Sequence, residues 1–359
     1  MTATVMITTG GTGGHVFPGL AVAAKLLARG CRVFWLGTRE GMEARLVPAH
    51  GVEFEAVSFR GVRGKGWRTL VVGPFALLRA CVDSLRVIRR RRPNVVLGFG
   101  GFASFPGALM GVAAGKHLVV HDANAVAGLA NRVLALGADR VLLGFPGAMR
   151  GSRTTFVGNP LRDDIVALPP PAERFAGRTG PLRVLVVGGS LGAAALNEAL
   201  PAALAAIDEA KRPQVVHQAG ERHVDALRAA YARAGARAEC VAFIDDMAAR
   251  YGWADVVVCR GGALTIAELA AVGLGAIVVP LPGAIADEQT ANAKFLLDAG
   301  GAIVLPQSHL TGPDAPLAGI LGALTRSDAR TMAIAAYRVG KRDAAERVAD
   351  ACIALATSE

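Results

Sequence analysis

Residues 8–15 read Thr-Thr-Gly-Gly-Thr-Gly-Gly-His, and this stretch decides the fold of the chain. It follows a β-type run at 4–7 and precedes a helical pattern from about Pro18 to Ala28. Its four glycines carry no Cβ that would keep an anion from the backbone. The helix behind them presents free N–H groups and the positive end of its dipole. The stretch therefore predicts a seat for a phosphate or diphosphate, and its His15 can move a proton near neutral pH.

The same order of strand, loop and helix repeats along the chain, which is typical of a mostly parallel sheet covered by helices. A length of 359 residues exceeds one typical core, so we expect two Rossmann-like α/β domains. The expected strands lie at 32–36, 94–99, 117–121 and 140–144, and then at 183–187, 214–218, 255–259, 276–280 and 302–305.

The boundary between the two domains is expected near residue 160. Gly158-Asn159-Pro160 and then Pro169-Pro170-Pro171 form a stiff connection rich in helix breakers. We predict domains at 1–160 and 161–340, with an amphipathic helix from about Lys341 to Ala356, within 341–359, that packs back on the first domain. The connection is expected to act as a hinge for domain closure.

Glycine-rich loops follow two strands in each half, at 10–15 and 98–101 and at 188–192 and 260–263. Ligands of such sheets bind beyond the carboxyl ends of the strands, so these loops are expected to hold two diphosphates. A nicotinamide or flavin enzyme is disfavoured. Val16 stands where the last glycine of the dinucleotide fingerprint belongs, and Leu36-Gly37-Thr38-Arg39 offers no acid for a ribose.

The five cysteines (Cys31, Cys81, Cys240, Cys259 and Cys352) have no metal-binding or paired spacing, and they suit small core positions in a reducing compartment. The N-terminus has no pattern of a signal peptide. Residues 94–115 carry no charge over 22 positions, long enough to cross a bilayer. Their six glycines and Pro106 favour a strand, a loop and a helix instead.

Nearly all of the net charge of +10 lies between Arg60 and Arg92, where ten Arg or Lys and one acid give 10 − 1 = +9. Apolar residues are interleaved with these charges, which is typical of a surface that lies on an anionic membrane. An amphipathic helix with a solvated basic face, starting at Pro74 and ending before Pro93, is the alternative. Nucleic acid is disfavoured because no nucleic-acid-binding motif accompanies the charge. The predicted membrane-binding residues are Lys65, Trp67, Arg68, Leu70, Val71, Phe75, Leu78 and Arg79.

Taken together, the motifs resemble those of the family 28 glycosyltransferases of GT-B fold that act on lipid I. The matching stretches are 10–21, 61–66 (Gly-Val-Arg-Gly-Lys-Gly), 158–162 (Gly-Asn-Pro-Leu-Arg), 188–193 (Gly-Gly-Ser-Leu-Gly-Ala), 243–247 (Phe-Ile-Asp-Asp-Met), and 263–265 (Ala-Leu-Thr) with Glu268. The resemblance implies inverting transfer of N-acetylglucosamine from UDP-N-acetylglucosamine to the C4 hydroxyl of the muramic sugar of lipid I. Lipid II for peptidoglycan synthesis and UDP are the products.

The resemblance also implies where the enzyme works and with what partners. It implies a peripheral protein on the cytoplasmic face of the bacterial membrane, active in cell-wall biogenesis, cell shape and division. UDP-N-acetylglucosamine, lipid I and an anionic membrane surface are the expected partners, and proteins of cell-wall synthesis and division are candidates. No cofactor and no metal are expected. The chain contains no Asp-x-Asp, in agreement with a metal-independent transferase.

The roles of single residues follow from the resemblance. His15 is the candidate general base, the alternative being a residue that only orients a phosphate. Glu268 takes both ribose hydroxyls, the alternative being a solvated helix glutamate. Ile244 contacts uracil through its backbone, and its side chain belongs to the core. The other expected donor-binding residues are Thr12, Gly13, Gly14, Asn124, Arg162, Ser190, Ala263, Leu264, Thr265, Ile266, Ala267 and Gln289.

The chain departs from the family pattern in three places. His121-Asp122-Ala123-Asn124 stands where the family commonly has His-Glu-Gln-Asn, which leaves the role of the replaced pair open. Gly261 stands where Ser is frequent. The family varies in length around 287–292, so Gln289 carries an uncertainty of one residue. A non-catalytic UDP-sugar-binding regulator and a UDP-sugar epimerase are the alternative functions. Intact His15 and Glu268 disfavour the first, and the basic, apolar window disfavours the second.

Overall fold

The computed structural model describes residues 3–11, 13–59, 66–189, 192–284, 287–312 and 315–357, without the side chains of 66–72. The chain forms two compact units. The first comprises residues 1–162 and 341–359, and the second comprises 163–340. The chain therefore leaves the first unit after Arg162 and returns to it at Lys341.

The first unit contains a seven-stranded sheet among its described residues, in the order β3-β2-β1-β4-β5-β6-β7. All neighbouring strands run parallel. The strands are β1 Thr4–Thr8, β2 Arg32–Thr38, β3 Glu53–Val57, β4 Val95–Gly98, β5 His117–Asp122, β6 Arg140–Leu143 and β7 Thr154–Phe156. Because β1 and β4 are neighbours, the loops that follow them meet at one edge of the sheet.

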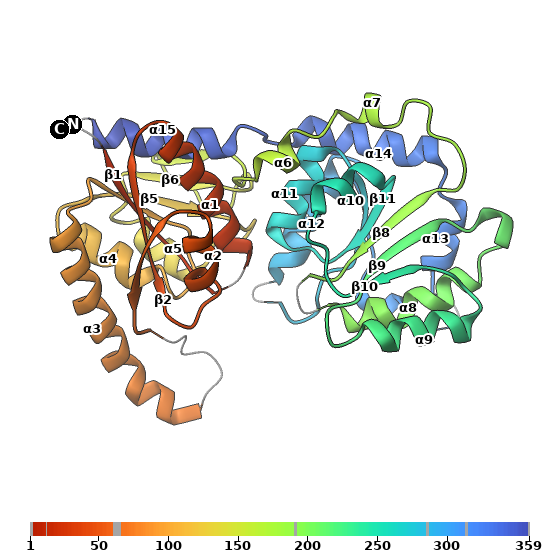
Figure 1. Ribbon diagram of the computed structural model, residues 1–359, viewed down its shortest axis with the longest axis horizontal. Coiled ribbons are helices and arrows are strands. Elements are labelled where there is room, and N and C mark those ends of the chain that lie inside the picture. Colours follow the sequence, from red (N-terminus) through yellow and green to blue (C-terminus); the bar gives the residue numbers. More distant parts are fainter. Residues whose placement is uncertain are drawn as a thin grey trace. The chain divides into compact units, whose positions relative to one another are not determined.

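Helices cover both faces of this sheet. They are α1 Gly13–Ala28, α2 Glu43–Ala49, α3 Gly66–Arg91, α4 Phe105–Ala113, α5 Leu129–Leu134 and α15 Ala344–Ala356. Figure 1 shows α1 and α15, in red and blue, side by side. They share one core, in which Leu26, Trp35 and Val348 are fully buried. The helices α3, α4 and α5 contribute to the core on the other face, with Ile88, Ala108 and Leu134.

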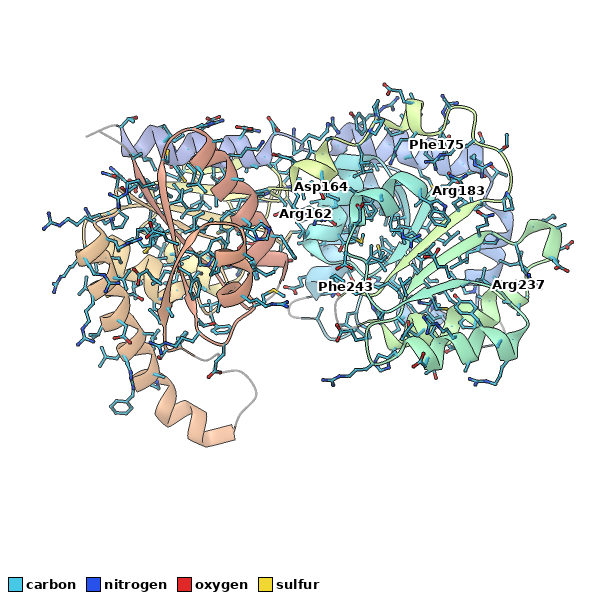
Figure 2. The ribbon with its side chains drawn as sticks, viewed as in Figure 1. Arg162, Asp164, Phe175, Arg183, Arg237 and Phe243 are labelled. Carbon is cyan, nitrogen blue, oxygen red and sulfur yellow. The ribbon has the colours of Figure 1, made fainter. Side chains whose placement is uncertain are left out.

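The second unit contains a six-stranded parallel sheet among its described residues, in the order β10-β9-β8-β11-β12-β13. The strands are β8 Arg183–Val187, β9 Gln214–Gln218, β10 Glu239–Val241, β11 Val256–Cys259, β12 Gly275–Val278 and β13 Ala302–Val304. The helices are α6 Asp163–Val166, α7 Pro171–Arg174, α8 Ala194–Ala205, α9 Val224–Ala234, α10 Met247–Trp253, α11 Ala263–Val272, α12 Glu288–Asp298, α13 Leu317–Ala323 and α14 Arg326–Val339, with short 3-10 turns at Glu209–Lys211 and Gln307–His309. Figure 2 labels Arg183, where β8 begins, and Phe243, which follows β10, at opposite ends of this sheet.

Each strand expected from the sequence is present, with ends that shift by two residues at most. Three further strands, β3, β7 and β10, were not expected, and each is an edge strand. Two helix starts were wrong. The first helix begins at Gly13 and contains Pro18, and α3 begins at Gly66 and contains Pro74. The C-terminal helix is α15 and packs on α1 in the first unit.

The uncharged segment 94–115 forms β4, a loop and α4, as expected. Among the helices of the described residues, none combines the length and apolar character needed to cross a bilayer. All five cysteines are free and buried, as the sequence indicated.

The stretch 158–162, expected as part of a connection, is packed into the first unit. Gly158 accepts a hydrogen bond from His121 Nε2 at 2.9 Å, and Asn159 Nδ2 donates to Ala123 at 3.0 Å. A Cβ on Gly158 would lie 2.4 Å from the Cβ of Lys341, and the φ of Gly158 is +89°. Glycine is therefore required where the returning chain passes the departing one.

Candidate functional site

The loops after β1 and β4 touch each other in the first unit. A Cβ on Gly101 would lie 3.3 Å from the carbonyl oxygen of Gly10, and 3.8 Å from Cδ2 of His15. The fully buried Trp35 fixes the end of β1, because its Nε1 donates to the Thr9 carbonyl at 3.0 Å. Gly13 and Gly14 open α1 and are partly exposed, so the expected phosphate seat faces solvent.

His15 occupies the first turn of α1, beside the loop after β4. Burial lowers the pKa of His15 below its usual 6.5, against smaller raising effects from Asp122 and a hydrogen bond with the Phe99 backbone. His15 Nδ1 is buried and has no hydrogen-bond partner within the described part of the chain. The imidazole is therefore neutral at neutral pH, the form that can accept a proton.

A carboxylate that the sequence did not single out lies under this loop. Glu43, the first residue of α2, is fully buried. It accepts hydrogen bonds from Thr38 N at 3.0 Å, Thr38 Oγ1 at 2.7 Å and Gly11 N at 3.2 Å. A Cβ on any of three glycines, Gly10, Gly37 and Gly41, would overlap its side chain. Glu43 thus ties the glycine-rich loop to the end of β2. In the sequence, the one hint of this role is that Gly41-Met42-Glu43 follows a β-type run.

The replaced pair in His121-Asp122-Ala123-Asn124 has a clear structural role. Asp122 is buried and accepts from the backbone of Asn124 and Gly128, each at 3.1 Å, and from Asn131 Nδ2 at 2.9 Å. These bonds fix the loop after β5. Burial, as the largest effect, lowers the pKa of His121 to about 4, so this residue stays neutral. Asn124, an expected donor contact, is partly exposed on the same loop.

In the second unit, β8 and β11 are neighbours, so their glycine-rich loops also lie together. A Cβ on Gly192 would lie 2.0 Å from the Ala219 carbonyl oxygen, so the loop after β8 requires glycine there. Gly262 precedes α11 without a side-chain cap, and the first bond within the helix is from Ile266 N to the Gly262 carbonyl. No side chain therefore caps the first N–H groups of α11, which belong to Ala263, Leu264 and Thr265. An anion-binding site at a helix start requires such uncapped N–H groups.

Glu268 lies one turn further along α11 and is half-buried. Its Oε2 accepts a hydrogen bond from the hydroxyl of Tyr251 on α10 at 2.9 Å. The side chain of Ile244 is buried, as the sequence indicated, while its neighbour Phe243 is 51% exposed. Ile266 is buried and Ala267 partly exposed, so these residues contribute packing and backbone to α11.

Gln289 holds backbone in place on the same side of the sheet. Its Oε1 accepts from Gly261 N at 3.1 Å and from Leu281 N at 3.0 Å, and Asn292 Nδ2 donates to the Gly261 carbonyl at 3.1 Å. A Cβ on Gly261 would lie 2.3 Å from the Gln289 carbonyl oxygen. The start of α12 thus occupies the space that a serine would need at 261. The sugar contact expected of Gln289 stays a prediction.

Arg162, the last residue of the first unit, lies with its guanidinium 5.7 Å from the ring centre of Phe17 on α1. Several expected site residues lie outside the described residues. They are Thr12, Ser190 and Lys65, and the side chains of Trp67, Arg68, Leu70 and Val71.

One face of α3 carries exposed apolar side chains. Phe75 is 72%, Leu78 63% and Val82 41% exposed. Arg79 and Arg89 are exposed at helical spacing from them. Other arginines of the helix are paired with acids: Arg86 with Asp83, Arg90 with Glu55, and Arg91 with Glu53. The unpaired positive charge on the described side chains of α3 is therefore smaller than their sequence suggested.

Comparison with known proteins identifies the family. Residues 5–143 match the glycosyltransferase family 28 N-terminal domain, and 183–348 match the glycosyltransferase family 28 C-terminal domain. A protein of Dechloromonas aromatica is 54% identical, over 99% of this chain and 100% of its own length. One of Ralstonia nicotianae is 55% identical, over 98% and 96%. Both are named UDP-N-acetylglucosamine–N-acetylmuramyl-(pentapeptide) pyrophosphoryl-undecaprenol N-acetylglucosamine transferase.

Solved structures agree in fold. The crystal structure of Acinetobacter baumannii MurG is 38% identical and covers 98% of this chain and 99% of its own, with a TM-score of 0.85. The calicheamicin glycosyltransferase CalG4, at 17% identity and a TM-score of 0.68, shares the fold alone. The two parallel-sheet units are those of the GT-B fold, as expected. With both domains matched and relatives above 50% identity along nearly its whole length, the chain belongs to glycosyltransferase family 28.

Proposed function

We propose that the chain transfers N-acetylglucosamine from UDP-N-acetylglucosamine to the C4 hydroxyl of the muramic sugar of lipid I, with inversion, giving lipid II and UDP. One observation carries this function. The relatives that share more than half of its residues, end to end, are transferases named for this donor and this acceptor. The chain is thus an enzyme of peptidoglycan synthesis.

The second unit makes most of the donor contacts in this proposal. UDP leaves as a diphosphate, so negative charge grows on it in the transition state. The uncapped start of α11 offers N–H groups and a helix dipole for that charge, with Ser190 on the loop after β8. Glu268 accepts from the ribose hydroxyls, the backbone of Ile244 contacts uracil, and Gln289 and Asn124 contact the sugar. Arg162 anchors the donor by a charge-assisted hydrogen bond.

The first unit holds the acceptor and the base. The acceptor hydroxyl loses a proton as it attacks the anomeric carbon, so a base is required. His15 is neutral for the reason given above and stands at the start of α1, where Thr12, Gly13 and Gly14 meet the sugar and the acceptor diphosphate. The imidazole takes the proton from the hydroxyl while the glycosyl–phosphate bond breaks.

A transfer assay tests both proposals. Labelled UDP-N-acetylglucosamine and a lipid I analogue are mixed with the protein without divalent metal. We expect label in the lipid, and a loss of at least ~100-fold for His15→Ala, a typical general-base effect. His50→Ala, an exposed histidine of the same unit, is the matched control and should stay near wild type.

The outcomes separate the alternatives. If His15→Ala still transfers the sugar, the proposed transferase activity stands but His15 is not the general base. Binding of UDP-N-acetylglucosamine without transfer favours a non-catalytic binding protein. Conversion of the free UDP-sugar without acceptor favours an epimerase.

We also propose that the protein lies on the cytoplasmic face of the membrane that holds its lipid acceptor. The exposed face of α3, with Phe75, Leu78, Val82, Arg79 and Arg89, supports this placement because apolar side chains insert while arginines meet anionic headgroups. In a sedimentation assay with vesicles of anionic phospholipid, Leu78→Glu should reduce the amount of vesicle-bound protein by at least about 80%. This is a rough value for a charge placed in lipid. Leu27→Glu, at an exposed leucine of α1, is the control. An equal loss of vesicle binding in both variants would show that α3 is not the membrane contact.

A further inference from the structure

Tyr251 is a buried tyrosine whose one polar atom is directed at a proposed binding residue. It lies on α10, is 1% exposed, and donates its hydroxyl hydrogen to Glu268 Oε2 at 2.9 Å. A buried hydroxyl needs a partner, but a carbonyl oxygen would serve that need equally well. Here the partner is a half-buried carboxylate on the next helix.

The Glu268 carboxylate lies close to the proposed binding site of the donor diphosphate. Glu268 follows Thr265 by three residues on α11, so both lie on one face of the helix. Thr265 belongs to the uncapped first turn, where the proposed donor diphosphate binds. A carboxylate has about four lone-pair directions, so a hydrogen bond from Tyr251 does not by itself use up the acceptors that two adjacent hydroxyls need.

Free rotation of the Glu268 side chain would weaken the binding of the two ribose hydroxyls. A glutamate side chain has three rotatable bonds, and ordering it when a ligand binds lowers affinity. The bond from a rigid, packed phenol orders the carboxylate when the protein folds. We infer that Tyr251 is a positioning residue that fixes the Glu268 carboxylate in the orientation that receives both hydroxyls of a ribose, and so sets the preference for ribonucleotides. This inference rests on the proposed donor site.

The test compares UDP with 2′-deoxy-UDP by titration calorimetry on the full chain. Wild type should prefer UDP by at least ~10-fold, because a carboxylate that loses its donor is left poorly satisfied. Tyr251→Phe should weaken UDP binding about 5- to 10-fold and lower the UDP/deoxy-UDP ratio at least ~3-fold. The KM for UDP-N-acetylglucosamine should rise by the same factor, with kcat within about twofold.

The chain supplies a matched control. Tyr231 is also buried in the second unit, and its hydroxyl bonds His217 Nδ1 at 2.9 Å. Tyr231→Phe removes the same atom from a comparable bond, and it should leave both the ratio and the KM unchanged. A loss of thermal stability shared by both variants would report only the missing hydrogen bond.

Glu268→Gln separates the inference from the function beneath it. If Glu268→Gln leaves the UDP/deoxy-UDP ratio unchanged, the ribose contact of the proposed function is wrong. If Glu268→Gln lowers the ratio but Tyr251→Phe matches Tyr231→Phe, the ribose contact stands and Tyr251 is only a packing residue. A fall in the ratio for both Glu268→Gln and Tyr251→Phe supports the inference.

Discussion

Among single residues of the first unit, Glu43 has a demanding environment. Its carboxylate is fully buried, and its hydrogen bonds come from Thr38 and Gly11. No arginine or lysine pairs with it among the described residues. The described donors to this buried side chain are N–H and O–H groups, so each of them matters to the shape of the loop before α1.

We expect Glu43→Gln to disturb that loop. One end of the amide is a donor, and it would face an N–H of Gly11 or Thr38, at a cost of about 1–3 kcal/mol in the free energy of unfolding. The transfer rate should also fall, because His15 follows the same loop. Urea unfolding and kcat measure the two effects. Glu53→Gln, at an exposed acid of β3, is the control, and equal effects in both variants would contradict the role of Glu43.

The pH dependence of activity follows from His15. Its pKa is lowered, so the base stays neutral until the pH falls below 6.5. The acid limb of kcat/KM for lipid I should therefore have its midpoint below pH 6.5 and continue downward as protons bind the imidazole. A pH–rate profile of the wild-type protein measures this. A midpoint above 6.5 would mean that a different group limits the rate.

At the scale of elements, the amino ends of the central strands in the second unit are tied by a buried ion network. Asp255, which precedes β11, is fully buried. Its oxygens accept from Arg178 at 2.5 Å, from Arg326 at 3.1 Å and from the backbone of Arg183 at 3.0 Å. This network lies at the end of the sheet opposite the glycine-rich loops, so it supports the fold and leaves the site to the other end.

Asp255→Ala should destabilise the second unit by about 3–5 kcal/mol, because it leaves two arginines without their buried partner. Asp225→Ala, in the exposed pair with Arg228, should change stability by less than about 1 kcal/mol. Urea unfolding with UDP binding as a probe of the second unit measures both. Similar stabilities for the two variants would show that the network contributes little.

The strands that sequence patterns missed share one property. Each of β3, β7 and β10 lies at the edge of a sheet, is three to five residues long, and buries few side chains. Interior strands of parallel sheets are buried on both faces and carry apolar runs, which is why they could be predicted. The predicted starts of α1 and α3 were wrong because Pro18 and Pro74 were taken as first-turn residues. Both prolines lie inside their helices.

The site divides along similar lines. The positions of the glycine-rich loops after the strands, and of His15 in the first turn of α1, could be predicted because a strand, a glycine-rich loop and a helix form a local pattern in the sequence. The contacts of Glu43 with Gly11 and of Tyr251 with Glu268 could not, because the partners lie 32 and 17 positions apart in the sequence. The side-chain role of Gln289 was also hidden, since its two backbone donors come from separate loops.

At the scale of the molecule, α15 completes the first unit from the far end of the chain. Val348, Ala349 and Cys352 are fully buried in the core that α1 and β2 share. Val348→Asp should unfold or strongly destabilise this unit, since a carboxylate without a partner is costly in a core. Ala354→Asp, exposed on the same helix, should be tolerated. Thermal unfolding and UDP binding test this, and a stable, active Val348→Asp would contradict it.

The return of the chain at Lys341 also has a consequence for biosynthesis. The ribosome makes the first 162 residues early, but the last helix of their core emerges only after residues 163–340 have been made. The second unit is contiguous and can fold while it is being synthesised. The first unit must wait, with the apolar face of α1 uncovered, until α15 has been made. A nascent chain of this protein thus exposes the uncovered face of α1 to chaperones until α15 leaves the ribosome.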